Sequence, residues 1–381
     1  MIARAVAAAV AGLVWAIGGP VGAAPAGATL LFHLGDGRIG EASGIAVGLI
    51  SPGVVYVHND SGDRARFFAV DRRTGATRAT YTVPGARNVD WEDIAVAPDA
   101  RGVPSVWLAD IGDNSASRTE IAVYRVDEPH VDGSALDVAA STAVPDTWRL
   151  RYPGAAADAE ALAVSPRGSA YVFTKSLDGT AHAFALPEHA DASRVQSLRA
   201  IGSVRIGFTG TAGGPNPFGQ RTVTGAALSR DGATLALRTY TDAYVWPVRG
   251  GDVTAAIRTK PVRLALPAQP LGEGIALERA GLLIDSEGKG SAVFGLDLPP
   301  LAAATTSSTA TTAARPSPAD PLSPQRAPTP TDKHDGHLVW AGVGAALLII
   351  AMLYAMARLS APQRRQSRRD RRRDRQARRP R

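Results

Sequence analysis

Short runs in which apolar and polar residues alternate follow one another from about residue 29 to residue 299. Turns rich in Gly, Asp and Asn separate them. An alternation of period two is typical of strands that bury one face, and such turns are typical of antiparallel hairpins. The runs are also rich in β-branched and aromatic residues, which strands favour. The pattern therefore predicts an all-β domain built of consecutive hairpins.

One motif recurs five times in this region. It consists of an acidic or polar residue two places before an apolar residue, with small residues around it. The central apolar residues are spaced 49, 68, 64 and 49 positions apart; they are Ile45, Ile94, Leu162, Ala226 and Ile275. A repeat of this length fits one four-stranded blade of a β-propeller. Because a β-sandwich needs no recurring motif, we predict a propeller with five blades.

The fifth repeat offers one strand fewer than the others. The segment 29–37, TLLFHLGDG, precedes the first repeat and has no other assignment. We expect it to supply the missing outer strand, so that an N-terminal strand closes the ring. Six blades are the alternative, because the insertion at 207–220 and the long stretch before Trp148 have room for a further strand pair.

Segments on both sides of the propeller predict an exported and anchored protein. Residues 1–28 begin with a charge at Arg4, continue through an apolar stretch and end in small residues, as a signal peptide does. After the propeller at 29–299 comes a stalk at 300–337, rich in Pro, Thr, Ser and Ala. Residues 338–357 then run 20 positions without a charge, long enough for one helix to span a bilayer core of about 30 Å.

The net charge of +7 comes from the end of the chain. Residues 358–381 hold 12 Arg and 2 Asp, so the remainder is slightly acidic. A basic run directly after a membrane span stays in the cytoplasm and lies on anionic lipid head groups. We therefore predict a cell-membrane protein with an extracytoplasmic propeller, a cytoplasmic C-terminus and no nucleic-acid partner. The chain has no Cys, which excludes disulfides and thiolate catalysis.

Acidic residues stand two or four places before the central apolar residue in several repeats. Residues two apart in a strand point to the same side, so these side chains should gather where the inner strands begin, at one mouth of the central channel. The second strand of each hairpin ends at the same mouth. Together the two sets predict these cation ligands: Glu41, Asp60, Asp90, Glu92, Asp110, Asp113, Asp158, Glu160 and Glu273.

Oxygen ligands without Cys or a close His pair favour a hard cation, and Ca²⁺ is the natural candidate. The same mouth is expected to hold the residues that contact a small ligand: Asn59, Lys175, Arg238, Tyr240 and Glu287. Lys175 and Arg238 suit an anionic group such as a phosphate or a carboxylate. The alternative is structural, because repeated carboxylates at blade starts also cap turns and pair with neighbouring blades.

Three functions fit this arrangement. The first is binding of a small ligand, a cation or a partner at the acidic mouth. The second is a Ca²⁺-dependent phosphoesterase or esterase, in which Lys175 and Arg238 hold the anion and four carboxylates surround the metal: Glu92, Glu160, Glu273 and Asp110. The third is a structural platform for protein–protein contacts.

Several segments together are similar to a family of bacterial extracytoplasmic β-propellers of unassigned activity, which in turn resembles the esterase-like phytase propellers. The similarity covers most of 41–298 and rests on these segments: DWEDIAV, ADIGDN, VYRVDEP, DAEAL, TGAALSRDG, LRTY, GEGIAL and DSEG. It implies a propeller fold, an exported location and hydrolysis of phosphoesters or esters. Ser43 and Thr224 depart from the acidic pattern at the blade starts.

Overall fold

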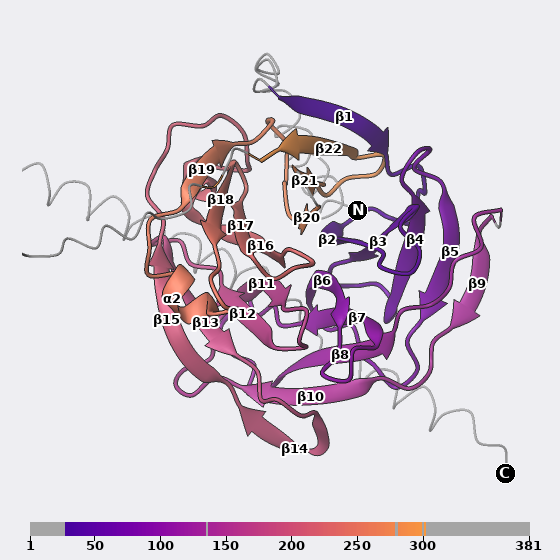
Figure 1. Cartoon of the computed structure of the whole chain (residues 1–381), viewed down its shortest axis with the longest axis horizontal. Coiled ribbons are helices and arrows are strands. Elements are labelled where there is room, and N and C mark those ends of the chain that lie inside the picture. Colours follow the sequence, from indigo (N-terminus) through magenta and orange to yellow (C-terminus); the bar gives the residue numbers. More distant parts are fainter. Residues whose placement is uncertain (1–26, 135, 279–280, 299–300, 302–381) are drawn as a thin grey trace, which may run out of the picture. The chain divides into compact units, whose positions relative to one another are not determined.

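The computed structural model describes residues 27–134, 136–278, 281–298 and 301. Within them five sheets stand around a central axis, and the first strand of each repeat lies innermost (Figure 1). The predicted five-bladed β-propeller is thereby confirmed. The six-blade alternative is wrong: the insertion at 207–220 contains no strand, and the stretch before Trp148 forms one strand that joins another blade.

The strands of each blade run from the axis outward in a simple antiparallel order. Blade one has β2 (Ala42–Val47), β3 (Val54–Asn59), β4 (Arg66–Asp71) and β5 (Thr77–Thr82). Blade two has β6 (Trp91–Pro98), β7 (Pro104–Asp110), β8 (Ile121–Asp127) and β10 (Asp146–Arg151). Blade three has β11 (Ala159–Val164), β12 (Ala170–Thr174), β13 (Thr180–Ala185) and β15 (Arg199–Arg205). Blade four has β16 (Val223–Leu228), β17 (Thr234–Thr239), β18 (Asp242–Pro247) and β19 (Val262–Ala265).

Blade five closes the ring. Its inner strands are β20 (Ile275–Leu277), β21 (Gly281–Ile284) and β22 (Ala292–Asp297), and β1 (Ala28–His33) pairs antiparallel with β22. The pairing brings Ala28 beside Leu296 and His33 beside Ala292. Phe32 of β1 is buried, whereas its neighbours Leu30 and Leu31 face solvent. The prediction that an N-terminal strand completes the last blade is confirmed.

Two linkers add a fifth strand to the blade that precedes them. β9 (Val138–Ser141) lies in the connection between two strands of blade two, yet pairs in parallel with β5 of blade one. β14 (Asp191–Ser197) belongs to blade three in sequence and pairs in parallel with β10 of blade two. The described part also holds a short helix, α2 (Val253–Ala256), and a 3-10 turn, η1 (Pro217–Arg221).

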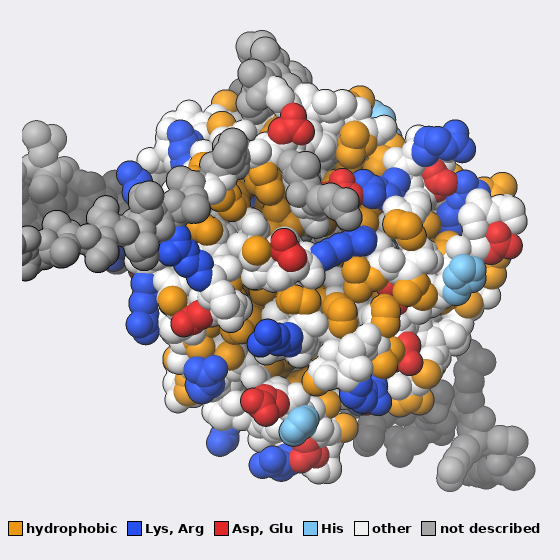
Figure 2. Space-filling view, in the orientation of Figure 1, with side chains coloured by type: hydrophobic (Ala, Val, Ile, Leu, Met, Phe, Trp, Pro, Cys, Tyr) orange, Lys and Arg blue, Asp and Glu red, His pale blue; other side chains and the backbone are white. Residues whose placement is uncertain are grey.

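The hydrophobic core is divided into five clusters, one between each pair of neighbouring blades. Trp91, Trp107, Trp148 and Trp246 all lie in these clusters, and the rings of Trp107 and Trp148 are 5.1 Å apart. Each blade therefore buries both of its faces, which fixes the directions of the inner strands relative to one another. The face seen in Figure 2 carries Lys, Arg, Asp and Glu interspersed, without a continuous patch of one sign.

No helix within the described ranges is both long and apolar enough to cross a membrane. Four predicted segments lie outside those ranges: the signal peptide up to residue 26, nearly all of the stalk, the membrane span at 338–357 and the basic tail.

Candidate functional site

The residues two places before each central apolar residue meet at the mouth, the end of the axis where the inner strands begin. All five are buried: Ser43, Glu92, Glu160, Thr224 and Glu273. The two that depart from the acidic pattern tie blades together. The Ser43 hydroxyl donates to the Glu92 carbonyl at 2.7 Å, and the Thr224 hydroxyl donates to the Glu273 carbonyl at 3.1 Å.

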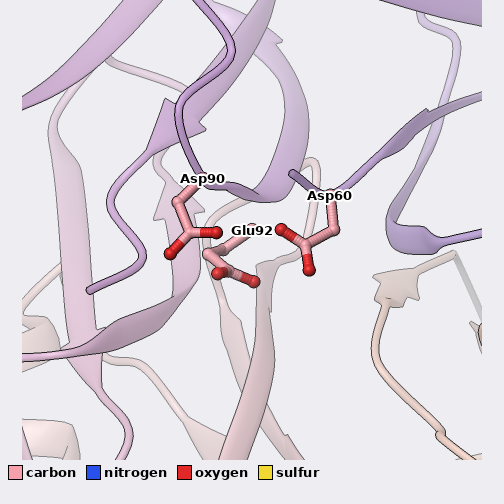
Figure 3. Close-up of side chains that lie close together, drawn as sticks. All are labelled: Asp60, Asp90 and Glu92. Carbon is pink, nitrogen blue, oxygen red and sulfur yellow. The ribbon is translucent and has the colours of Figure 1, made fainter. Parts of the chain in front are cut away.

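Three carboxylates converge on the side of the mouth formed by blades one and two (Figure 3). Asp60 follows β3, Asp90 precedes β6 and Glu92 lies in β6. One ligand oxygen from each lies within 4.8 Å of the others. We call these three residues the carboxylate triad. Their spacing suits a cation with oxygen ligands.

Burial and mutual repulsion act together on the triad. Burial raises the pKa of Asp60 to about 7, and the Asp90 carboxylate adds to the effect. Burial also raises the pKa of Glu92 well above its usual range, with further contributions from Glu160 and Asp60. Two like charges at this separation repel by about 3–4 kcal/mol at an effective dielectric constant near 20. The triad is therefore stable with fewer than three negative charges or with a bound cation.

A second group of side chains, the Lys175 cluster, occupies the other side of the mouth. The Lys175 ammonium pairs with the Glu160 carboxylate and lies 5.8 Å from the centre of the Tyr240 ring. Burial alone would lower the pKa of Lys175. The interactions with Glu160, Tyr240 and Glu273 outweigh burial and raise the pKa. Lys175 is thus a fixed positive charge at the mouth, already balanced by one carboxylate.

Glu273 completes the Lys175 cluster. Its side chain is 3% exposed, and its Oε2 has no hydrogen-bond partner within the described part of the chain. Burial and then the Glu160 carboxylate raise the pKa of Glu273 well above its usual range. A buried carboxyl oxygen without a partner is costly. It is therefore the atom at this mouth most ready to accept a cation, a proton or a ligand group.

The remaining predicted residues spread around the mouth in other roles. Asp110 forms an ion pair with Arg118 at 2.9 Å and accepts from the Asp90 nitrogen. Asp158 accepts from the Asp113 nitrogen at 2.8 Å, and Asp113 itself accepts from the Arg118 nitrogen. The bond from Asp113 to Asp158 joins blade two to blade three, and the others brace the loops of blade two beside the triad.

Four other predicted residues bind the backbone or are partly exposed. Arg238 is fully buried and donates to the carbonyls of Gly274 at 2.6 Å and Asp285 at 2.8 Å. It therefore links blade four to the backbone of blade five. The Asn59 side chain accepts from the nitrogens of Gly40 and Glu41 and fixes that loop. Glu41 is exposed, and Glu287 is half-buried.

Sequence reasoning missed Asp93 and Asp285, two fully buried carboxylates on the axis beneath the mouth. A signal for Asp93 was present. The position before the central apolar residue is small in four repeats, at Gly44, Ala161, Gly225 and Gly274, and acidic in the remaining one. Asp285 accepts from the Gly274 nitrogen at 2.8 Å, and burial raises its pKa to about 6.

A cavity of about 510 Å³ opens on the outer side of blade two. Its lining includes Arg87, Val89, Asp110, Arg118 and Tyr124. At the opposite end of the axis a cavity of about 40 Å³ is lined mainly by apolar residues of the inner strands. The polar chemistry of the axis is therefore concentrated at the mouth and directly beneath it.

No protein-family profile matches the chain, and no curated protein matches it. Among solved structures it is similar to the PQQ-bound aldose sugar dehydrogenase of Streptomyces coelicolor, with 15% identity over 72% of this chain and 99% of that one and a TM-score of 0.39. The XC5397 gluconolactonase of Xanthomonas campestris gives 16% identity, 74% and 93% coverage and a TM-score of 0.36.

The β-propeller domain of Cps50 (Swd1) of Myceliophteria thermophila gives 10% identity, 68% and 84% coverage and a TM-score of 0.34. At such identities the likeness concerns the fold alone. The class that the fold defines is the five-bladed β-propeller. The resemblance to phytase-like propellers stays a prediction.

Proposed function

We propose that the protein binds a divalent cation at the carboxylate triad, with Ca²⁺ as the natural occupant, and through it a small ligand with an anionic group. The observation that carries the proposal is the approach of three carboxylates to within 4.8 Å. Lys175 lowers the pKa of Glu92 electrostatically, but its ammonium group is already paired with the Glu160 carboxylate. A divalent ion would remove the repulsion, and carboxylate oxygens are the ligands Ca²⁺ prefers.

The Lys175 cluster supports the second half of the proposal. A ligand bound to the cation would meet the Lys175 ammonium across the mouth. Its organic part has space in the cavity of about 510 Å³ at blade two, which is lined by Asp110, the acceptor of the Asp90 nitrogen. An anionic group shared between a metal ion and a lysine is held by two charges of the same sign, which favours phosphate or carboxylate over neutral groups.

The direct test is thermal unfolding of the full-length protein in detergent, first with EDTA and then with Ca²⁺. A bound ion raises the midpoint, because it binds the folded state preferentially. Glu92→Gln is expected to abolish the shift. Glu188→Gln, which changes an exposed carboxylate far from the triad in sequence, is expected to keep it. No shift with Ca²⁺, Mg²⁺ or Mn²⁺ would contradict the proposal.

The second candidate is hydrolysis of phosphoesters or esters at the same site. The observation that favours it is Glu273, a buried carboxyl with an unpartnered oxygen beside Lys175. A cation at the triad would supply a bound water as nucleophile. Release of p-nitrophenol from its phosphate and acetate esters, dependent on Ca²⁺ and lost in Glu92→Gln, tests this. Binding of Ca²⁺ without turnover leaves the first function.

The proposal for the location is supported by the sequence alone. We propose an exported propeller, held at the cell membrane by residues 338–357 with the basic tail on anionic lipid of the cytoplasmic face. The small residues at 21–28 offer two cleavage places, near Ala24 and near Ala28. Ala24 is the better one, since β1 begins at Ala28. A partner protein at the mouth is the remaining alternative, for which no residue of the mouth offers a specific argument.

A further inference from the structure

Beneath the mouth the five inner strands approach one another so closely that most side chains would not fit. A Cβ atom added to Gly44 would lie 2.6 Å from the Ile94 nitrogen, and one added to Gly274 would lie 2.7 Å from the Ile45 nitrogen. At both places, the residue just before the central residue of one blade lies against a backbone N–H of the neighbouring blade. That N–H belongs to the neighbouring blade's own central residue. At Gly44 and Gly274 this contact leaves no room for a Cβ atom.

Blade two has Asp93 at this position, and its side chain fills the axis. Its Oδ1 accepts from the Ile94 nitrogen at 2.8 Å. Its Oδ2 accepts from the Leu162 nitrogen at 2.7 Å and from the Ala226 nitrogen at 3.2 Å. Ile94, Leu162 and Ala226 are the central residues of blades two, three and four. One carboxylate therefore receives the equivalent N–H groups of three blades.

The chemistry of this arrangement is that of an anion site. Backbone N–H groups that converge on one point stabilise a negative charge, as they do in backbone nests. Both oxygens of Asp93 act as acceptors, and the side chain is fully buried. Without it, three buried N–H groups would lose their partner, and each such loss is costly.

We infer that the axis of the propeller is an anion-binding site that the chain fills with its own Asp93 carboxylate, and that a small carboxylate such as formate takes its place when the side chain is removed. The same bonds hold β6, whose residue Glu92 belongs to the triad. Asp93 is accordingly a positioning residue for the cation site. This last part rests on the proposed function; the anion site itself does not.

The test is chemical rescue of Asp93→Gly in the full-length protein. Glycine is the residue of three other blades at this position, so the strands themselves accommodate it. The midpoint of thermal unfolding is expected to fall by on the order of 10 °C, because three buried N–H groups lose their acceptor. Sodium formate is expected to restore at least half of the loss, with saturation, while formamide at the same concentration restores none.

Asp93→Asn is the matched control. It fills the same space but turns an N–H₂ group toward a backbone donor, so it is expected to be destabilised and to gain nothing from formate. If Asp93→Gly does not fold alone, refolding from urea with and without formate becomes the assay. Recovery that depends on formate supports the inference. Equal behaviour of the glycine and asparagine variants in formate overturns it.

Ca²⁺ binding separates this inference from the proposed function. If the wild type binds Ca²⁺, formate is expected to recover the Ca²⁺ affinity of Asp93→Gly together with its stability. If the wild type shows no Ca²⁺ binding but formate still rescues the variant, the anion site stands and the cation proposal fails. If the wild type binds Ca²⁺ and formate rescues nothing, the cation site stands and the anion site fails.

Discussion

Carboxyl groups outnumber positive charges around the mouth, and their pKa values show the effect. Burial raises the pKa of Asp60, Glu92, Glu273 and Asp285. Away from the mouth, Asp71 pairs with Arg78, and this ion pair outweighs burial and lowers the pKa of Asp71 to about 2. The mouth is therefore the place where protons and cations compete most directly for the same oxygen atoms.

A pH dependence follows for the metal-free protein. The pKa of Asp60 is about 7 in the folded state, against an ordinary value of 3.8, so the folded state binds its proton more tightly than the unfolded chain does. Stability from this group is present below about pH 4 and is lost as the pH rises through 7. In EDTA the midpoint of unfolding is expected to fall between pH 6 and pH 8. The fall should be smaller in Asp60→Asn and absent with saturating Ca²⁺; a midpoint that rises over this range contradicts the assignment.

Gly112 gives a second prediction at the residue scale. A Cβ atom there would overlap the Glu92 carboxylate and approach the Asp90 carboxylate, both of them side-chain ends that can move. Gly112→Ala is expected to lower Ca²⁺ affinity by about tenfold, or about 1.4 kcal/mol, while the fold survives. Gly154→Ala, with open space around it, is the control. Calorimetric titration measures the Ca²⁺ affinity of both variants. Equal affinities would argue against the triad as the cation site.

The sequence predicted which acidic residues reach the mouth better than what each one contacts. Spacing from the central apolar residue placed Glu92, Glu160 and Glu273 correctly at the strand starts, because strand periodicity is local. It did not reveal that Glu160 is neutralised by Lys175, or that Arg238 is turned toward the backbone of blade five. Those contacts depend on the distance between neighbouring blades, which no local pattern encodes.

Among the elements, β1 has the clearest energetic role. It attaches to blade five through its pairing with β22, and Phe32 is its buried side chain in the cluster between blades five and one. Phe32→Ala is expected to cost about 3 kcal/mol, because it removes a buried aromatic ring and leaves a cavity. Leu30→Ala, at a position 50% exposed, is expected to cost less than about 1 kcal/mol. Urea unfolding compares the two; equal costs would mean that β1 contributes little to closure.

The elements that sequence analysis missed are β9 and β14. Both are added in parallel to the outer edge of a preceding blade. β9 has exposed residues on most positions and reads VAAS, a segment without the alternation that marks the inner strands. Its partner strand lies far earlier in the sequence, at Ala79 to Thr82. Such strands form because an open edge is available, so a periodicity argument does not find them.

At the scale of the whole molecule, the prediction concerns location. The full-length protein is expected in the membrane fraction, since residues 338–357 are long and apolar enough to span a bilayer. Deletion of 338–381 should move it to the soluble fraction, whereas deletion of 358–381 alone should leave it with membranes. Fractionation followed by immunoblotting measures this. Full-length protein in the soluble fraction would contradict the anchor.

The antiparallel pairing of β1 with β22 also determines how the molecule responds to mechanical load. Ala28 and Leu296 lie side by side, so the two ends of the described chain leave from the same end of this pair. Tension between the ends would open the hydrogen bonds one after another, as a zipper opens, instead of loading them all at once. This pair forms the outer edge of blade five and closes the ring onto blade one. Glu287 of blade five and Asp60 of blade one interact where these two blades meet. A modest pull would therefore detach β1 from blade five and open the ring between blades five and one, while blades one to four stay folded.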